Sequence, residues 1–343
     1  MDSNNKTKPY KGLFDKYNRH IDTLRISLTD RCNLSCVYCV DKKNFKLFPR
    51  ADVLTLEEIL FISKIFVYLG IKKIKLTGGE PLIRKGIIDL IKKINKFPGL
   101  SDLSLTTNGV FLPLDIDRLK QAGLKRINIS LDTLQREKYK AITGFDEFNN
   151  VIEGVEMVLN KGFSPVKINV VLLKGINSDE ITDFINLTRE KNLIVRFIEF
   201  MPTSNRLDWS KYFISGIDVL ERAQSLGKVE NENIFKEFGP ARYYKIKGYK
   251  GSFGLITAVS NSFCSQCNRL RLTSTGQLVL CLHNNISFNL RDLIRNKNVN
   301  EKEIKQIIKY AVLHKPAGHN LKLPDGLKEH FIKSSISMCY IGG

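Results

Sequence analysis

The 343-residue sequence lacks an apolar run long enough to cross a membrane. Its longest apolar stretches, such as residues 59–69, are interrupted by charge and are shorter than the roughly 20 residues of a spanning helix. Residues 1–20 are polar, include Asp2 and Asp15, and lack the apolar core of a signal peptide. We therefore expect a cytoplasmic protein with no membrane partner. The hydrophobic content of 43% also argues against a disordered chain.

Acidic residues are scarce relative to basic ones. The 35 Asp and Glu against 54 Lys and Arg give a net charge of +19, which favours an anionic partner. Much of the excess is lysine on expected helices, such as Lys92, Lys93 and Lys96, where a solvated face is its usual meaning. The sequence also lacks the alternation of basic and aromatic residues on which nucleic-acid bases stack. The charge alone supports binding of a nucleotide, a nucleic acid or an acidic protein about equally, and the missing alternation argues against nucleic acid.

Two groups of cysteines each lack the fourth ligand of a closed metal site. The first cysteine trio is Cys32, Cys36 and Cys39, and the second cysteine trio is Cys264, Cys267 and Cys281. A structural zinc ion takes four ligands, whereas a [4Fe–4S] cluster on three cysteines keeps one iron open. In a reducing compartment such groups indicate metal sites rather than disulfides. A zinc knuckle with a distant fourth ligand, or unrelated buried cysteines, are the alternatives.

Residues 21–205 alternate strand and helix patterns in six βα units, which predicts parallel strands with helical crossovers. Six units are too few for a closed eight-stranded barrel. We therefore expect an α/β fold, a partial (βα)6 TIM-like barrel. The expected strands cover residues 24–28, 73–77, 103–107, 126–130, 166–173 and 194–199.

Several of these strands alternate strictly between polar and apolar residues. Side chains two residues apart in a strand share a face, so the polar residues of these strands predict a wet, cationic barrel lumen. A sheet with one face exposed to solvent would give the same alternation and is the alternative. The polar residues are Arg25, Ser27, Lys75, Thr77, Ser104, Thr106, Asn128, Ser130, Lys167 and Asn169. The unusual loops all follow strand ends, where parallel barrels form active sites.

Beyond residue 205 the alternation lapses into a β-rich and helical extension that carries the second cysteine trio. Residues 1–20 are expected to be a flexible extension, 21–205 the barrel, and 206–343 the cluster-binding and substrate-binding region. Neither trio offers a convincing general base for zinc hydrolase chemistry. His283 follows Cys281 by two residues, but a lone histidine is more often a surface or packing residue. No catalytic acid or base is assigned.

The order of the motifs resembles one family of radical S-adenosylmethionine (SAM) enzymes, the GTP 3′,8-cyclases that open molybdenum cofactor biosynthesis. The similarity extends from about residue 25 to residue 343. It rests on CxxxCxxC after the first strand, LTGGEP, TTNG, INISLDTL, AITG, INVVLLKGIN, RFIEFMP, CxxCNRLR with LCL, and a terminal Gly-Gly. A set of motifs in this order is highly specific.

The resemblance implies that each trio holds a [4Fe–4S] cluster. SAM would chelate the open iron of the first, and its reductive cleavage would give a 5′-deoxyadenosyl radical. That radical would take hydrogen from C3′ of GTP, whose guanine binds the second cluster, and C3′ would join C8 to give (8S)-3′,8-cyclo-7,8-dihydro-GTP. The residues implied for SAM are Tyr38, Gly79, Glu80, Ser130 and Met201. Those implied for GTP are Arg25, Lys75, Thr106, Lys167, Arg269, Leu270, Arg271, Gly342 and Gly343.

The family commonly has arginine where this chain has Lys75, and lysine binds phosphate as a point charge without the bidentate fork. The resemblance also implies a homodimer and a downstream cyclic pyranopterin monophosphate synthase, while the electron donor stays unassigned. Two alternatives remain. One is a radical SAM enzyme that modifies a peptide, and the other, of a different class, is a zinc-stabilised nucleic-acid-binding protein.

Overall fold

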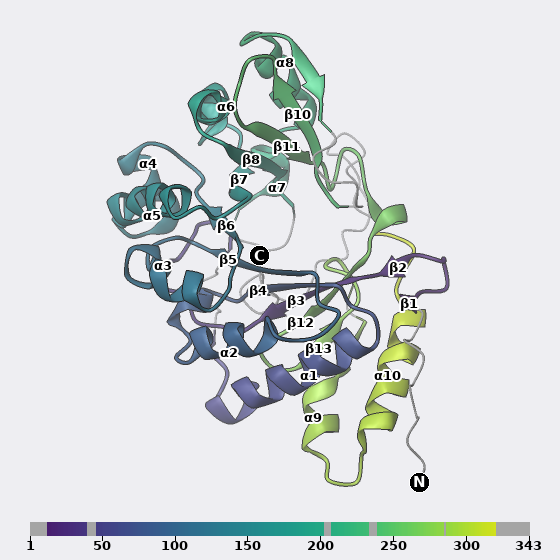
Figure 1. The fold of residues 1–343 in the computed structure, drawn as a ribbon. Helices are drawn as coiled ribbons and strands as arrows, with labels where there is room; N and C mark the ends of the chain where they lie inside the picture. Colours follow the sequence, from purple (N-terminus) through teal and green to yellow (C-terminus); the bar gives the residue numbers. More distant parts are fainter. Residues whose placement is uncertain (1–11, 40–45, 202–206, 233–238, 285, 320–343) are drawn as a thin grey trace.

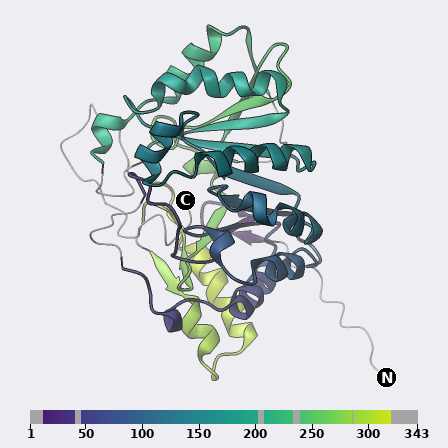
Figure 2. The same cartoon turned by 90° about the vertical axis from the view of Figure 1, so that its left-hand side faces the viewer.

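The computed structural model describes residues 12–39, 46–201, 207–232, 239–284 and 286–319. Their strands form one large curved sheet and one small hairpin, and helices α1 to α6 lie along one side of that sheet (Figures 1 and 2). The order of strands in the large sheet is β14-β13-β12-β3-β4-β5-β6-β7-β8-β11-β10-β9. Within the described residues no helix is both long and apolar enough to cross a membrane.

The elements have the following bounds. The strands are β1 Leu13–Phe14, β2 His20–Ile21, β3 Thr23–Ser27, β4 Lys73–Thr77, β5 Asp102–Thr107, β6 Arg126–Ser130, β7 Val166–Leu172, β8 Leu193–Glu199, β9 Val229–Asn231, β10 Arg242–Ile246, β11 Ser252–Ile256, β12 Arg269–Leu272, β13 Gln277–Val279 and β14 Ser287–Asn289. The α-helices are α1 Leu56–Tyr68, α2 Ile87–Ile94, α3 Leu112–Gln121, α4 Arg136–Thr143, α5 Phe148–Asn160, α6 Ile181–Glu190, α7 Trp209–Tyr212, α8 Gly216–Gln224, α9 Leu290–Arg295 and α10 Glu301–Leu313. Short 3-10 turns are η1 Arg50–Asp52, η2 Pro81–Ile83, η3 Ser178–Glu180 and η4 Cys264–Gln266.

Strands β3 to β8 are the six predicted parallel strands, so the partial barrel is confirmed. The C-terminal region extends it on both sides, because β12 pairs parallel with β3 and β11 pairs parallel with β8. Among the described strands the edges β14 and β9 do not pair with each other, so the sheet stays open. The extension expected from residue 206 onward is therefore part of the same sheet.

Alternation along the strands separates core from lumen as the sequence predicts. Leu24, Ile26 and Ile74 are fully buried, with no exposed surface, in the core under the helices. The register brings the polar residues between them into one row, with Arg271 opposite Arg25 and Arg25 opposite Lys75. The concave face of the sheet thus collects cations from three neighbouring strands.

Residues 12–21 form an ordered hairpin, which corrects the expected flexible extension over residues 1–20; residues 1–11 lie outside the described residues. Leu13 and Ile21 are 2% and 0% exposed in the core. The turn is closed by an ion pair at 2.6 Å between Arg19 Nε and Asp15 Oδ2, and both side chains are buried. The sequence did not predict this hairpin, because the segment is mostly polar and is anchored by only two apolar residues and one buried ion pair.

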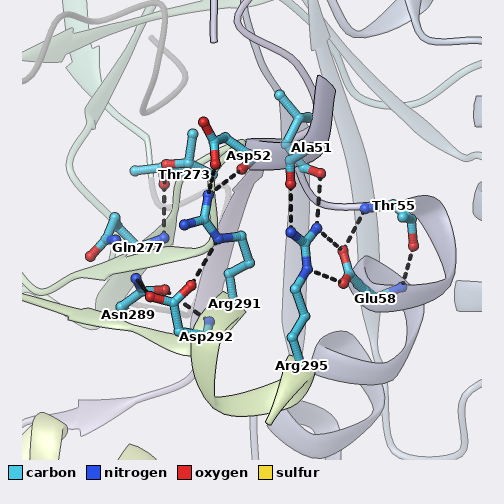
Figure 3. Close-up of polar contacts among 12 residues, drawn as sticks. Ala51, Asp52, Thr55, Glu58, Thr273, Gln277, Asn289, Arg291, Asp292 and Arg295 are labelled. Carbon is cyan, nitrogen blue, oxygen red and sulfur yellow. Dashed lines mark hydrogen bonds and ion pairs between the residues drawn. The ribbon is translucent and has the colours of Figure 1, made fainter. Parts of the chain in front are cut away.

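Helix α9 is fastened to the start of α1 by two arginines (Figure 3). Arg295 forms a bidentate pair with Glu58, at 2.7 and 3.0 Å, and Arg291 Nη1 donates to the carbonyl of Asp52 at 2.8 Å. Glu58 also forms a capping box with Thr55 at the start of α1. These partly exposed ion pairs contribute little individually. Together they fix the β12–β13 hairpin and α9 beside the first βα unit.

Candidate active site

A cavity of about 300 Å³ opens at the carboxyl ends of the parallel strands. All six cysteines of the two trios line it, together with residues from the loops after β3, β4, β5, β6 and β8. The sequence prediction that the strand-end loops meet at one mouth therefore agrees with the fold. The other polar wall residues used below are Arg25, Tyr38, Lys75, Gly79, Thr106, Asn128, Ser130, Asp132, Asn169, Arg196, Arg269, Arg271, His283, Lys315 and His319.

The first cysteine trio lies on the loop after β3, which is held by the C-terminal end of α4. Ser35 N–H donates to the carbonyl of Thr143 at 2.8 Å, and Val37 N–H donates to that of Ile142 at 2.9 Å. Thr143 belongs to the AITG segment, and its hydroxyl in turn donates to Tyr139 and Phe145 carbonyls. The α4 helix, which the sequence did not reveal, thus fixes the backbone between the cysteines.

The GGEP segment after β4 packs directly against the same loop. Gly79 N–H donates to the Thr29 carbonyl at 2.7 Å, and a Cβ on Gly79 would lie 2.2 Å from the Arg31 carbonyl oxygen. Only glycine permits this approach. Glu80 is fully buried behind the cavity wall, where it accepts from Thr107 Oγ1 and Asn108 N–H at 2.7 Å each. Burial raises the pKa of Glu80 to about 7, despite these donors.

Tyr38 from the cysteine loop pairs with Asp132, which follows β6. The Tyr38 hydroxyl donates to Asp132 Oδ2 at 2.5 Å, and Val171 N–H donates to Oδ1 at 2.8 Å. Asn177 of the KGIN segment supports this corner by donating to the Asp132 carbonyl at 2.8 Å. Burial raises the pKa of Asp132 to about 6. Asp132 was not among the predicted site residues, although it lies in the INISLDTL motif.

Ser130 and Met201, the other residues that the resemblance assigns to SAM, also line the cavity. Ser130 ends β6, and Met201 follows β8. Four of the five implied SAM residues therefore form the wall near the first cysteine trio. Glu80 is the exception, because its carboxylate lies behind the wall and accepts hydrogen bonds from Thr107 and Asn108 at the end of β5.

Five cationic side chains of the cavity wall come from β3, β4, β8 and β12. They are Arg25, Lys75, Arg196, Arg269 and Arg271. Burial, reinforced by the neighbouring Arg196 and Arg25, lowers the pKa of Lys75 well below its usual value. Burial and Arg269 lower that of Arg271 to about 10. Gathered positive charge of this kind strongly favours an anionic ligand.

Arg196 is a cavity residue that the prediction missed. It lies on β8, its exposed fraction is 8%, and its Nη2 donates to Asn128 Oδ1 at 2.8 Å. Its Nε has no hydrogen-bond partner among the described residues. A sequence signal was present, because Arg196 stands in the RFIEFMP segment; in the sheet it lies opposite Asn169 of the neighbouring strand.

Two residues implied for GTP do not line the cavity. Lys167 is 5% exposed and its Nζ donates to the Tyr243 hydroxyl at 3.3 Å. Burial, with Arg196 nearby, lowers the pKa of Lys167 to about 5. Leu270 is fully buried in the hydrophobic core, because it alternates with the inward-facing Arg269 and Arg271. Thr106 does line the wall, and Gly342 and Gly343 lie outside the described residues.

The second cysteine trio is surrounded by cationic and histidine side chains. Burial alone would raise the pKa of Cys267, but Arg269 and Lys315 outweigh it and lower the value to about 6. Lys315 is 2% exposed and donates to the carbonyls of Arg269 and Leu280 at 2.9 and 2.6 Å. His319 hydrogen-bonds to Cys264. Neither Lys315 nor His319 carries a sequence signal, since both are far along the chain from the cysteines.

His283 is buried in the cavity wall rather than at the surface. Its exposed fraction is 9%, its ring meets that of His319 edge to face at a centroid distance of 5.1 Å, and its Nδ1 has no hydrogen-bond partner among the described residues. The expected packing role accounts for the ring but not for this nitrogen.

The donor sets fit iron–sulfur clusters. Each trio offers three cysteine sulfurs, and thiolate-only donors are typical of clusters or zinc. In the described part of the chain, no three His, Cys, Asp or Glu side chains are grouped to hold a single metal ion. A cubane binds each thiolate through a different iron and so needs wider spacing than one ion does. Arg271 Nη1 and Asn169 Oδ1, buried without a partner in the described structure, leave polar capacity for ligands.

Two family models match consecutive parts of the chain. The Radical SAM superfamily model matches residues 26–188, and the Molybdenum Cofactor Synthesis C model matches residues 193–321. The first runs from the end of β3 through β7 and includes the first cysteine trio, and the second begins at β8 and includes the second trio.

Curated relatives match almost the whole chain. A GTP 3′,8-cyclase of Alkaliphilus oremlandii is 44% identical over 96% of this chain and 99% of its own length. One of Petrotoga mobilis is 43% identical over 96% and 100%. A crystal structure of Streptococcus suis SuiB bound to S-adenosylmethionine aligns with a TM-score of 0.57 at 14% identity, covering 93% of this chain and 77% of that one. This last likeness concerns the fold alone.

Proposed function

Because the chain belongs to the GTP 3′,8-cyclase family, we propose that its cavity binds SAM and GTP together and that it catalyses the radical cyclisation of GTP. The observation that carries the proposal is the convergence of two incomplete cysteine trios on one cationic cavity. Bound clusters would supply the electron that cleaves SAM and an open iron for the guanine. The residues of the chain itself would bind and orient the two ligands and exclude water from the cavity.

On the SAM side, residues 21–205 supply the first trio and the walls around it. Ser130, Met201, Tyr38 and the Gly79 backbone lie at the strand ends where a ligand of the first cluster would sit. Tyr38 is held by Asp132, so its ring has a fixed orientation. Glu80 acts indirectly, by fixing the Asn108 backbone and the Thr107 hydroxyl behind the wall.

On the GTP side, Arg25, Lys75, Arg269 and Arg271 are proposed to bind the triphosphate, with Arg196 added to the predicted set. The support is their shared place in the wall, with Arg25, Lys75 and Arg271 side by side in the sheet register. Thr106 contributes a hydroxyl to the same wall. For Lys167 the support is indirect, because its side-chain nitrogen Nζ donates to the Tyr243 hydroxyl behind the wall. The backbone of Leu270 spaces the two arginines.

The remaining expectations are proposals that rest on the family. They are a homodimer, a cyclic pyranopterin monophosphate synthase that takes the product, and a cytoplasmic location. Two cysteine trios that hold metal clusters suit a reducing compartment. The terminal Gly342 and Gly343 are proposed to enter the active site, so deleting both should abolish cyclisation while SAM cleavage continues.

The test is anaerobic incubation of the reconstituted protein with SAM, reductant and GTP. We expect about eight irons per chain if both clusters form. We also expect 5′-deoxyadenosine to be released together with (8S)-3′,8-cyclo-7,8-dihydro-GTP. SAM cleavage with unchanged GTP would contradict the substrate, and stoichiometric zinc without iron would contradict the reaction class.

A further inference from the structure

The N-terminal hairpin places one buried arginine against the loop of the second cysteine trio. Arg19 is 7% exposed, and its Nη1 donates to the carbonyl of Cys264 at 2.7 Å. The same nitrogen donates to the Ala317 carbonyl at 2.8 Å, and Nη2 donates to the Pro316 carbonyl at 2.6 Å. The guanidinium therefore joins a cysteine of the trio to the segment that carries Lys315 and His319.

The position of this guanidinium is itself fixed. Asp15 Oδ2 accepts from Arg19 Nε at 2.6 Å, and Asp15 Oδ1 accepts from the backbone N–H groups of Tyr17 and Arg19. The Arg19 fork is thus held by a buried carboxylate on one edge and meets three carbonyls on the other. Such a planar group with several donors is preorganised in a way that a lysine is not.

The other end of the same cysteine loop is also held from the N-terminal side. Asn268, which follows Cys267, donates its side-chain amide to Asp22 Oδ1 at 2.6 Å. Its carbonyl accepts from the backbone N–H groups of Asp22 and Thr23 at 3.2 Å each. Residues 19 and 22 therefore bracket the Cys264–Asn268 turn across about 245 residues of sequence.

We propose that Arg19 is a positioning residue for the second iron–sulfur cluster, acting through the carbonyls of Cys264, Pro316 and Ala317. By its hydrogen bond to the Cys264 carbonyl, Arg19 fixes the position of the Cys264 turn relative to the cavity. By its hydrogen bonds to residues 316 and 317, it also positions the His319 side chain for its hydrogen bond to Cys264. Removing the guanidinium takes one donor from each of three carbonyls and from Asp15 Oδ2, so the turn shifts and the cluster opens to solvent. This inference rests on the proposed function, because it assumes a cluster on the second trio.

The experiment compares Arg19→Ala, Arg19→Lys and Arg118→Ala in the full-length holoenzyme. Arg118 is the matched control, an exposed arginine of α3 that pairs with Asp115 away from the cavity. The parent and each of the three variants are also made with Cys32, Cys36 and Cys39 replaced by alanine, so that only the second cluster remains. Iron release to a chelator and the change of the cluster's EPR signal on adding GTP are measured.

For Arg19→Ala we expect iron release from the second cluster to accelerate about tenfold and the GTP-induced EPR change to be lost. Arg19→Lys, which keeps the charge but not the fork, should give an intermediate acceleration of about threefold. Arg118→Ala should match the parent. In the variants that keep the first trio, SAM cleavage without GTP should stay within about twofold of the parent, since no contact of Arg19 reaches that trio.

Unchanged iron release and an unchanged GTP-induced EPR signal in Arg19→Ala would overturn the proposal. If Arg19→Ala does not fold, Arg19→Lys decides between the same outcomes. An equal loss of both clusters would also contradict it, because it would indicate a general loss of stability. If the parent itself holds no second cluster, the proposed function fails instead, so the two failures are distinguishable.

Discussion

The two cysteine trios line one cavity but are built in different ways. The first lies on a loop after β3 and is held by backbone contacts from α4 and from the GGEP segment, all within the six βα units. The second is held by Arg19, Asp22 and Lys315, which come from opposite ends of the chain. The contacts that hold the first trio thus come from within the six βα units, whereas those that hold the second come from residues 19–22 and from residue 315.

The electrostatic surroundings of the trios differ as well. Burial, with the Asp132 carboxylate beside it, raises the pKa of Cys36 well above that of an ordinary thiol. Near Cys267, cations outweigh burial and lower the pKa to about 6. The first half of the cavity contains one carboxyl group, that of Asp132 hydrogen-bonded by Tyr38, and the second half concentrates positive charge. This division agrees with a zwitterionic ligand on one side and a triphosphate on the other.

The largest expected effect comes from removing the trios one at a time. Cys36→Ala should abolish SAM cleavage, by at least about 10³-fold, because no open iron remains to bind SAM. Cys267→Ala should keep SAM cleavage and lose cyclisation. Release of 5′-deoxyadenosine and of cyclised GTP is measured for each. Formation of cyclised GTP by Cys267→Ala would contradict the proposal that the second trio is needed for cyclisation and the first for SAM cleavage.

Lys75→Ala tests the cationic half. Loss of a buried charge-assisted contact should weaken GTP binding about 10- to 30-fold, with the affinity for SAM changed much less. Equilibrium binding of both ligands to the reconstituted enzyme is the measurement. Lys92→Ala, which removes an exposed lysine of α2, is the control. Equal GTP affinity in Lys75→Ala and the parent would exclude Lys75 from the substrate site.

Tyr38→Phe tests the acidic half by leaving Asp132 without its hydroxyl donor. We expect SAM affinity to fall about 5- to 10-fold, because the ring is no longer anchored and a buried carboxylate loses a partner. GTP affinity should stay within about twofold of the parent. A larger loss of affinity for GTP than for SAM would contradict the assignment of Tyr38 and Asp132 to the SAM side of the cavity.

Thiol alkylation sharpens the electrostatic contrast. In the metal-free protein at pH 7, Cys267 with a pKa of about 6 is mostly thiolate, while Cys36 is protonated. Cys267 should react at least about fivefold faster even after allowance for its lower intrinsic nucleophilicity. Its rate should reach half its plateau near pH 6, as followed by peptide mass spectrometry. In the unfolded chain both should titrate together near pH 8.5, and the same behaviour in the folded chain would refute the contrast.

Much of the fold could be predicted because it depends on local patterns. The strands β3 to β8, the capping box of α1 and the inward-facing Arg25 and Lys75 follow from alternation and spacing. Helix α4 was missed because it falls inside a strand-to-helix connection. The hairpin over residues 12–21 was missed because its anchors, Leu13 and Ile21, are single apolar residues in a polar segment.

The sequence by itself determined the six parallel strands, the polar face of each and the two cysteine trios, since each of these depends on residues a few positions apart. The contacts of Arg19 and Lys315 with the second trio, and the position of Lys167 behind the cavity wall, emerge only from the folded chain. The physical reason is that these placements depend on strand pairing and burial between segments up to 298 residues apart, on which local periodicity has no influence.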